Sequence, residues 1–236
     1  MTKDDSGTIP DAEPLAAAAD LGTALRELVE VSVTTTVPAG EVRAAAELVR
    51  QVTERLAVAR RPASQLSALD DVRTGRRVFS PVTGVGSALA PPLVLRRSGD
   101  GVAGEAVLGV AYEGPPSYVH GGMSALLMDQ VLGDTAAAAG VWGMTAHLEL
   151  DYRGPLPVGE PLLFRGSVAE SDGRKSLIVG TIALATAPDQ PLVEARGLFV
   201  TPRREKLEAY FGAITDGSGG QRPTSMASDA TALGED

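Results

Sequence analysis

The sequence predicts an α+β fold in which an antiparallel sheet wraps around one long buried helix, with extra helices at the N-terminal end. Residues 121–139 have helical character and are apolar nearly all round, so this helix is expected to be buried rather than to lie on a surface. Segments with the two-residue alternation of strands come before and after it. Because a helix that is apolar on every side must be covered, one sheet curled around it satisfies both patterns.

The N-terminal part of the chain is expected to be a helical extension to the main domain. Residues 1–14 are polar and acidic and are interpreted as a disordered lead-in. Within an extension over 15–77, apolar residues recur at helical spacing over 15–31 and 38–61. The stretch 62–91 is rich in helix breakers and small residues, which predicts an irregular segment.

The main domain is expected over residues 78–212, and strands account for most of it. The expected strands are Leu93–Arg97, Val102–Tyr112, Met144–Tyr152, Pro161–Glu170, Ser176–Thr186 and Leu192–Thr201. A short closing helix is expected over 203–212, and a disordered tail over 213–236.

The composition excludes several classes of function. The formal net charge is −9, the chain has no cysteine, and His120 and His147 are its two histidines. A disulfide framework, a thiolate metal site and a cysteine nucleophile are therefore excluded, and the acidic balance argues against a protein that coats nucleic acid. Residues 1–20 carry a net charge of −4 and residues 213–236 carry −3, so the expected domain is close to neutral.

Signals for targeting are not evident in the sequence. The N-terminus lacks a basic region followed by an apolar stretch, and no apolar run approaches the ~18 residues that a membrane span needs. These observations favour a cytoplasmic protein.

Two glycines at the start of the long helix are the first candidate functional residues. Without side chains, Gly121 and Gly122 leave backbone N–H groups open to close approach, and the first amides of a helix lack partners within it. Such an end can bind a thioester or ester carbonyl and stabilise the oxyanion that develops there. The alternative is that the glycines only allow tight packing.

Asp129 is the second candidate, because it falls on a helix face otherwise suited to a core. A buried carboxylate needs a partner or a task, and a raised pKa would suit a general base that activates water. A structural Asp bonded to neighbouring backbone is the alternative, and Asp134 is expected on another, solvated face. His120 and Asp129 are half a turn apart on an ideal helix, so they converge only if His120 precedes the first turn or if sites form between two chains.

Two segments of the chain together resemble the PaaI-type hotdog-fold acyl-CoA thioesterases. The first is His120-Gly-Gly, with Asp129 nine positions after the histidine. The second begins at Gly143 and reads Gly-Met-Thr-Ala-His-Leu-Glu-Leu-Asp-Tyr-Arg-Gly-Pro-Leu-Pro. The resemblance covers about 78–205. It implies a hotdog fold, hydrolysis of acyl-CoA thioesters, and two protomers paired edge to edge, as a homodimer or a dimer of dimers, with active sites between them. It implies no metal or redox cofactor, since coenzyme A is part of the substrate.

The same resemblance implies roles for individual residues. Asp129 would be the general base or nucleophile, the Gly122 amide would polarise the carbonyl beside Gly121, and His120 would orient the substrate or Asp129. Thr145 would position water or the carboxylate, although strict alternation directs it away from Asp129 in the same chain. A bulge at the strand start or a site shared with a partner chain would resolve this conflict. His147 stands where relatives more often have Asn and is given no role.

Basic residues are candidates for binding the phosphates of coenzyme A. Arg174 and Lys175, just after an expected hairpin turn, are the strongest pair; Arg153, Arg165 and Arg203 are weaker candidates.

Three other functions remain open from the sequence. One is a non-catalytic hotdog protein that binds acyl-CoA or lipid, because a fold does not determine a function. Another is a hotdog hydratase or dehydratase, whose Asp and His pair, five positions apart, is not found here. The third is that helices 15–61 serve a partner protein.

Overall fold

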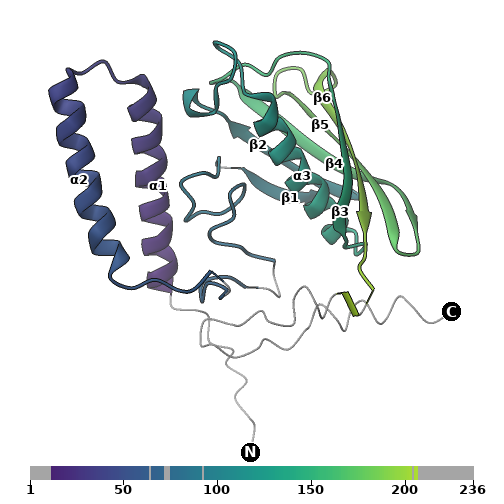
Figure 1. Cartoon of the computed structure of the whole chain (residues 1–236). Helices are drawn as coiled ribbons and strands as arrows, with labels where there is room; N and C mark the ends of the chain where they lie inside the picture. The colour runs from purple at the N-terminus through teal and green to yellow at the C-terminus, as the bar shows by residue number, and fades with distance from the viewer. Residues whose placement is uncertain (1–11, 64, 72–74, 92, 204, 207–236) are drawn as a thin grey trace, which may run out of the picture.

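The computed structural model describes residues 12–63, 65–71, 75–91, 93–203 and 205–206 of the chain. Figure 1 shows a curved sheet with one helix against its inner face and a pair of helices to one side. The expected tail 213–236 and residues 1–11 of the expected lead-in lie outside the described residues, as does most of the closing helix 203–212. The prediction of disorder was wrong for residues 12–14, which begin the first helix.

The sheet has six antiparallel strands, and their order places one edge beside the central helix. In spatial order the strands are β1 (Val94–Ser98), β2 (Gly101–Val107), β4 (Pro161–Asp172), β5 (Lys175–Leu184), β6 (Pro191–Val200) and β3 (Met144–Tyr152). In the sequence, the central helix α3 (Gly121–Ala138) lies between β2 and β3. The sequence prediction of an antiparallel sheet wrapped around this helix is confirmed (Figure 1). Since β3 pairs only with β6, its other edge has no partner among the described strands.

One face of α3 is fully buried against the sheet, while the rest of the helix is partly accessible. The buried residues are Ser124, Leu127, Met128, Val131, Leu132, Thr135 and Ala136. They pack with inward-facing strand residues such as Phe164, Ile178 and Ile182, none of which is exposed. The expectation of a helix buried on all sides is therefore too strong, because Leu126 on the opposite face is 38% exposed.

Glycines in the strands allow α3 to lie close to the sheet. Gly180 of β5 is paired with Gly166 of β4, and both lie under the helix. A Cβ on Gly180 would lie 2.6 Å from Met128 Cε and 2.7 Å from the carbonyl oxygen of Arg165. Helix and sheet therefore approach more closely than side chains on these strand positions would allow.

The strand expected over Val102–Tyr112 is shorter than the sequence suggests. It ends at Val107, and Val110–Tyr112 forms a single 3₁₀ turn, η1. The carboxylate of Glu30, from the N-terminal helices, accepts hydrogen bonds from the N–H groups of Val110 and Ala111 at 2.9 and 3.0 Å. A carboxylate from a distant segment thus satisfies the first amides of this turn, which alternation within the strand could not indicate.

Two N-terminal helices form an antiparallel hairpin, α1 (Ala12–Thr34) and α2 (Ala39–Ala57) (Figure 1). Among the described residues, the contacts of this hairpin with the main domain come from α1. Gly22 is buried against the backbone of Val85 and Gly86, and Arg26 donates hydrogen bonds to the carbonyl oxygens of Val85 and Ser87. No residue of α2 is buried.

Helices of membrane-spanning length and hydropathy do not occur in the described part of the chain.

The close approach of α3 predicts that Gly180→Ala lowers the free energy of unfolding by about 1–3 kcal/mol, because a methyl group there must displace the Arg165 carbonyl. Urea denaturation measures the change. Gly40→Ala on α2 is the matched control, since a Cβ there meets nothing within 4 Å. An equal effect of the two substitutions would contradict the packing argument.

Candidate active site

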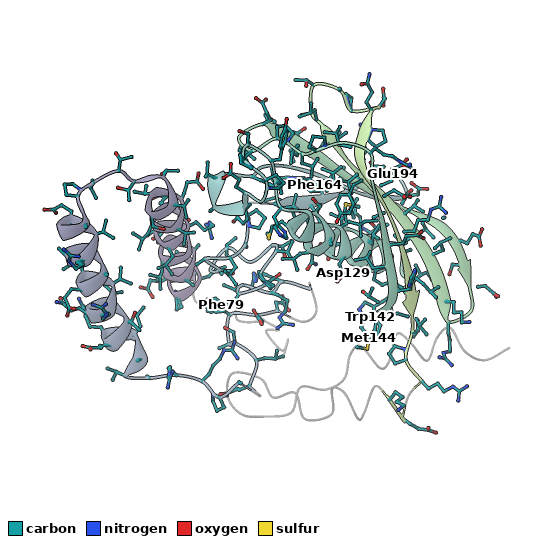
Figure 2. The ribbon with its side chains drawn as sticks, turned by 45° about the horizontal axis from the view of Figure 1, so that its top comes forward. Phe79, Asp129, Trp142, Met144, Phe164 and Glu194 are labelled. Atoms are coloured by element: carbon teal, nitrogen blue, oxygen red, sulfur yellow. The ribbon has the colours of Figure 1, made fainter. Side chains whose placement is uncertain are left out.

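Asp129 and Thr145 are brought together within one chain. The Thr145 hydroxyl on β3 donates a hydrogen bond of 2.8 Å to Oδ1 of Asp129 on α3. Asp129 is half-buried and Thr145 is exposed, so the fully buried carboxylate expected from the sequence is not found in the single chain. Figure 2 shows Asp129 on the accessible side of α3, toward the region of Trp142 and Met144.

A β-bulge at the start of β3 explains how Thr145 reaches Asp129. The pairing with β6 runs Thr145 with Phe199 and then His147 with Leu198, so Ala146 is an extra residue. Because directly paired residues point to the same face, Thr145 shares the helix-facing side with Phe199, which is 2% exposed. Of the two alternatives left by the sequence, the bulge is the one observed, and strict alternation was wrong at this position.

His120 caps the N-terminus of α3 through its side chain. Its backbone is extended, and its Nδ1 accepts a hydrogen bond of 3.0 Å from the Gly122 N–H. A ring nitrogen that accepts must carry a lone pair, so this arrangement belongs to the neutral imidazole with its proton on Nε2. The amide expected to polarise a carbonyl is therefore bonded to His120, and His120 makes no hydrogen bond with Asp129 among the described residues.

Tyr152 is a site residue that the sequence analysis missed. Its hydroxyl donates a hydrogen bond of 2.8 Å to the carbonyl oxygen of Gly121. That carbonyl and the Gly122 N–H belong to one peptide group, which is thus held at its oxygen by Tyr152 and at its nitrogen by His120. The alternation of Leu148, Leu150 and Tyr152 on the helix side of β3 was the signal that could have found it.

The glycine amide and the carboxylate lie on the same side of α3 but far apart along it. Gly122 and Asp129 are separated by seven residues, which is close to two turns and about 10 Å of rise. The N–H groups of a helix point toward its N-terminus, and therefore away from Asp129. One helix thus presents a donor at its end and a carboxylate on its flank, at two separate places.

The basic residues divide between two regions of the sheet. Lys175 on β5 pairs with Val200 on β6, and Val200 pairs with Met144 on β3. Lys175 therefore lies two strands, or about 10 Å, from Met144, which is the residue before Thr145. Arg174 donates a hydrogen bond to the carbonyl oxygen of Thr201 at the same end. Arg153 instead pairs with Glu194 at 2.7 Å, which raises the pKa of its guanidinium.

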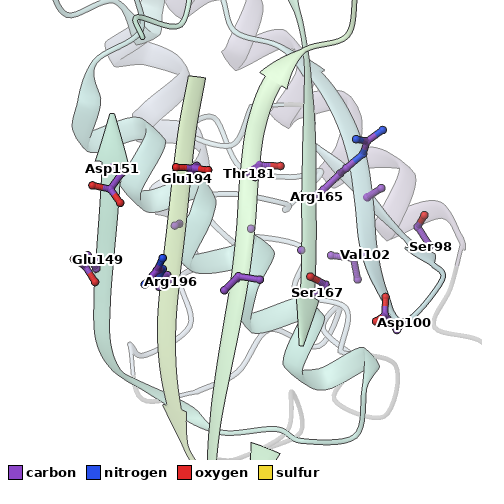
Figure 3. Close-up of a pocket in the computed structure, with 15 residues that line it drawn as sticks. Ser98, Asp100, Val102, Glu149, Asp151, Arg165, Ser167, Thr181, Glu194 and Arg196 are labelled. Atoms are coloured by element: carbon purple, nitrogen blue, oxygen red, sulfur yellow. The ribbon is translucent and has the colours of Figure 1, made fainter. Parts of the chain in front are cut away.

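A pocket of about 480 Å³ lies on the face of the sheet opposite α3 (Figure 3). Charged side chains of β3, β6 and β4 line it, among them Glu149, Asp151, Glu194, Arg196 and Arg165. His147 also faces this side, since it pairs with Leu198 and follows the bulge. None of Asp129, His120, Gly122 and Thr145 lines this pocket, so it is separate from the candidate site.

Asp134 is not the solvated residue expected from the helical wheel. It is half-buried on α3 and accepts a hydrogen bond of 2.7 Å from Gln130. Loss of hydration raises the pKa of this carboxyl above its ordinary value, and the Gln130 hydrogen bond opposes that rise.

Groups of three or more His, Asp or Glu side chains that could hold a metal ion do not occur among the described residues.

Taken together, the wrapped helix, the capped Gly121–Gly122 peptide and the Thr145–Asp129 pair define a hotdog-fold protein with a carboxylate beside the edge strand. Comparisons with known proteins identify the family. The family model described as "Thioesterase superfamily" matches residues 117–182, which include both parts of the site. A crystal structure of a thioesterase superfamily protein is 39% identical, covers 78% of this chain and 94% of its own, and has a TM-score of 0.67. The chain belongs to the thioesterase superfamily.

Curated relatives match a shorter region. The acyl-coenzyme A thioesterase THEM4 of Xenopus laevis is 34% identical over 89 residues, covering 37% of this chain and 39% of the relative. The Mus musculus protein of the same name is 32% identical over 99 residues, covering 42% of each. The chain therefore spans about two-fifths of the length of these relatives.

The raised pKa of Asp134 predicts a pH-dependent stability difference. Because the folded state binds this proton more tightly than the unfolded state, the carboxyl's contribution to stability falls as pH rises through its folded-state pKa. We expect Asp134→Asn to be more stable than the unsubstituted protein at neutral pH, and this advantage to shrink toward pH 3. Urea denaturation at a series of pH values measures it. An advantage that does not change with pH would contradict the prediction.

Proposed function

We propose that this protein hydrolyses acyl-CoA thioesters to the free acid and coenzyme A. The observation that carries the proposal is the Thr145–Asp129 hydrogen bond on the accessible flank of α3. Membership of the thioesterase superfamily and the names of the curated relatives support the substrate class.

In the proposed mechanism Asp129 acts as the general base. Thr145 donates to Oδ1, which leaves Oδ2 free to accept a proton from water. The water oxygen attacks the thioester carbonyl carbon, the carbonyl oxygen becomes an oxyanion, and the proton moves to Asp129. The C–S bond then breaks, and the thiolate leaves with the proton returned by Asp129. Direct attack by the carboxylate is the variant mechanism, in which an anhydride at Asp129 forms first and water hydrolyses it.

We further propose that each active site combines two chains. The oxyanion would be stabilised by the Gly122 amide at the N-terminus of α3, once substrate displaces the His120 ring from it. Asp129 of the same helix lies about 10 Å further along the helix axis than this amide. A water held at that Asp129 therefore cannot reach a thioester carbonyl that is bound to the amide. The unpaired edge of β3, next to Thr145, offers the pairing surface that would bring in a second chain.

Two further features fit a coenzyme A thioester as the substrate. Arg174 and Lys175 lie at the end of the sheet that carries Thr145, where their positive charges could bind phosphate groups. A second chain against β3 would also cover the half-exposed Asp129 and exclude bulk water from it, which strengthens electrostatic interactions there.

Loss of the base predicts that Asp129→Asn lowers kcat for acyl-CoA hydrolysis by about 10²–10⁴-fold. Release of free thiol from a panel of short to long acyl-CoAs measures the rate. Asp134→Asn is the matched control, because it makes the same chemical change one and a half turns further along α3, away from Thr145. Full activity of Asp129→Asn would overturn the mechanism; acyl-CoA binding by the unsubstituted protein without thiol release would overturn the function.

The shared site predicts complementation between two inactive variants. Gly122→Pro removes the proposed oxyanion donor within the first turn of α3, where the amide has no partner inside the helix, and Asp129→Asn removes the base. When differently tagged chains are co-expressed in equal amounts, about half of the dimers are mixed, and one of the two sites in each mixed dimer is intact. The activity of the whole preparation should therefore recover to roughly a quarter of that of the unsubstituted protein. No recovery in purified mixed dimers would place the donor and the base in a single chain.

A further inference from the structure

The α1–α2 hairpin carries a stripe of apolar residues along each helix. Within each stripe the spacing alternates between three and four residues, which is the pattern of helices that pack in bundles and coiled coils. The α1 stripe is Ala17, Leu21, Ala24, Leu28 and Val31, and the α2 stripe is Val42, Ala45, Val49, Val52 and Leu56.

The two stripes match in position along the helix axes, so that each residue of one stripe has a counterpart at the same height, or level, in the other. Val31 lies three residues before the end of α1 at Thr34, and Val42 lies three residues after the start of α2 at Ala39. The remaining pairs are equally spaced from the connecting loop: Leu28 with Ala45, Ala24 with Val49, Leu21 with Val52, and Ala17 with Leu56. Since both helices rise 1.5 Å per residue and run antiparallel, each pair lies at one level. Three of the five levels combine a large residue with alanine.

The described part of the chain does not cover these stripes. Leu21, Leu28 and Val31 of α1 are 38–58% exposed, and Val42, Val49, Val52 and Leu56 of α2 are 41–54% exposed. The contacts that attach α1 to the main domain use another face, which carries Gly22, Arg26 and Glu30. Among the described residues, no hydrogen bond or ion pair joins α1 to α2. Rows of exposed apolar side chains of this kind indicate a site of association.

We propose that the α1–α2 hairpin pairs with the same hairpin of a second copy of this chain, and that the two form a four-helix bundle. In such a bundle the large residues of each hairpin cover the apolar stripes of the other. Levels that combine a large residue with alanine leave room for the large residues of the partner hairpin. This inference is independent of the proposed hydrolysis.

The charges beside the stripes favour a second copy as the occupant. Asp20 and Glu27 immediately precede stripe residues of α1, while Arg43 and Arg50 immediately follow stripe residues of α2. These flanks face each other when two helices run in the same direction. If the two-fold axis is perpendicular to the helices, the α1 of one copy and the α2 of the other run in the same direction. The three acidic and three basic residues of α2 balance, unlike the basic polar face of helices that bind lipid surfaces.

The absence of cysteine from the chain allows a direct test by cross-linking. Val49 belongs to the middle level, which lies at the proposed two-fold axis, and Gln51 lies on the opposite side of the same helix. With a short bismaleimide, full-length Val49→Cys should form covalent dimers at least about tenfold more efficiently than Gln51→Cys, and this yield should persist on dilution.

A second pair of variants separates the stripe from general effects on the helix. Val52→Glu, added to Val49→Cys, should abolish the cross-link, whereas Gln51→Glu in the same background should preserve it. Because α2 has no buried residue, neither substitution disturbs the main domain. Equal cross-linking at positions 49 and 51 would overturn the proposal. Binding to lipid vesicles that Val52→Glu removes, without a cross-link at position 49, would assign the stripes to a membrane surface instead.

Discussion

Contact between α3 and the glycine-containing middle of the sheet determines how the helix is rotated. One face of α3, which includes Leu127, Val131 and Thr135, is buried, and Gly166 and Gly180 leave the space that this close approach needs. Once that face is buried, Asp129 must lie on the flank of the helix, where β3 passes. The N-terminus of α3, with His120 and Gly122, is then left at the accessible end. The position of each candidate group therefore follows from a packing contact that contains none of them.

One extra residue in β3 links this packing to the chemistry of the site. The bulge at Ala146 turns Thr145 toward the helix while the following residues keep their alternation, so Leu148 and Leu150 still pack inward. At its two ends the strand therefore touches α3 with polar groups, through Thr145 to Asp129 and through Tyr152 to the Gly121 carbonyl. Because both contacts come from an edge strand, the site remains open on the side where the sheet ends.

Separate parts of the single chain present surfaces suited to further association. The edge of β3 that has no partner among the described strands borders the half-exposed Asp129, and the apolar stripe of α1 lies on another face of that helix than the residues that contact the main domain. The two surfaces differ in their physical basis, since one offers backbone hydrogen bonds and the other apolar side chains. Both proposals of pairing, at the strand edge and at the hairpin, start from groups that the described residues leave without cover.

Local patterns in the sequence determined the elements, because alternation and helical spacing depend only on which side chains need burial. They predicted the wrapped helix, Met144–Tyr152 as a strand, and Asp129 as a candidate, whereas Thr145 became a candidate only through the resemblance to a family. The shortening of β2 at Val107 and the partial burial of both Asp129 and Asp134 depend on segments distant in the sequence, and so only the tertiary structure decided them. The same holds for the Thr145–Asp129 contact, since a bulge of one residue is a property of the pairing between two strands. The sequence by itself determined which groups are available, and the packing of α3 and the register of β3 decided which of them meet.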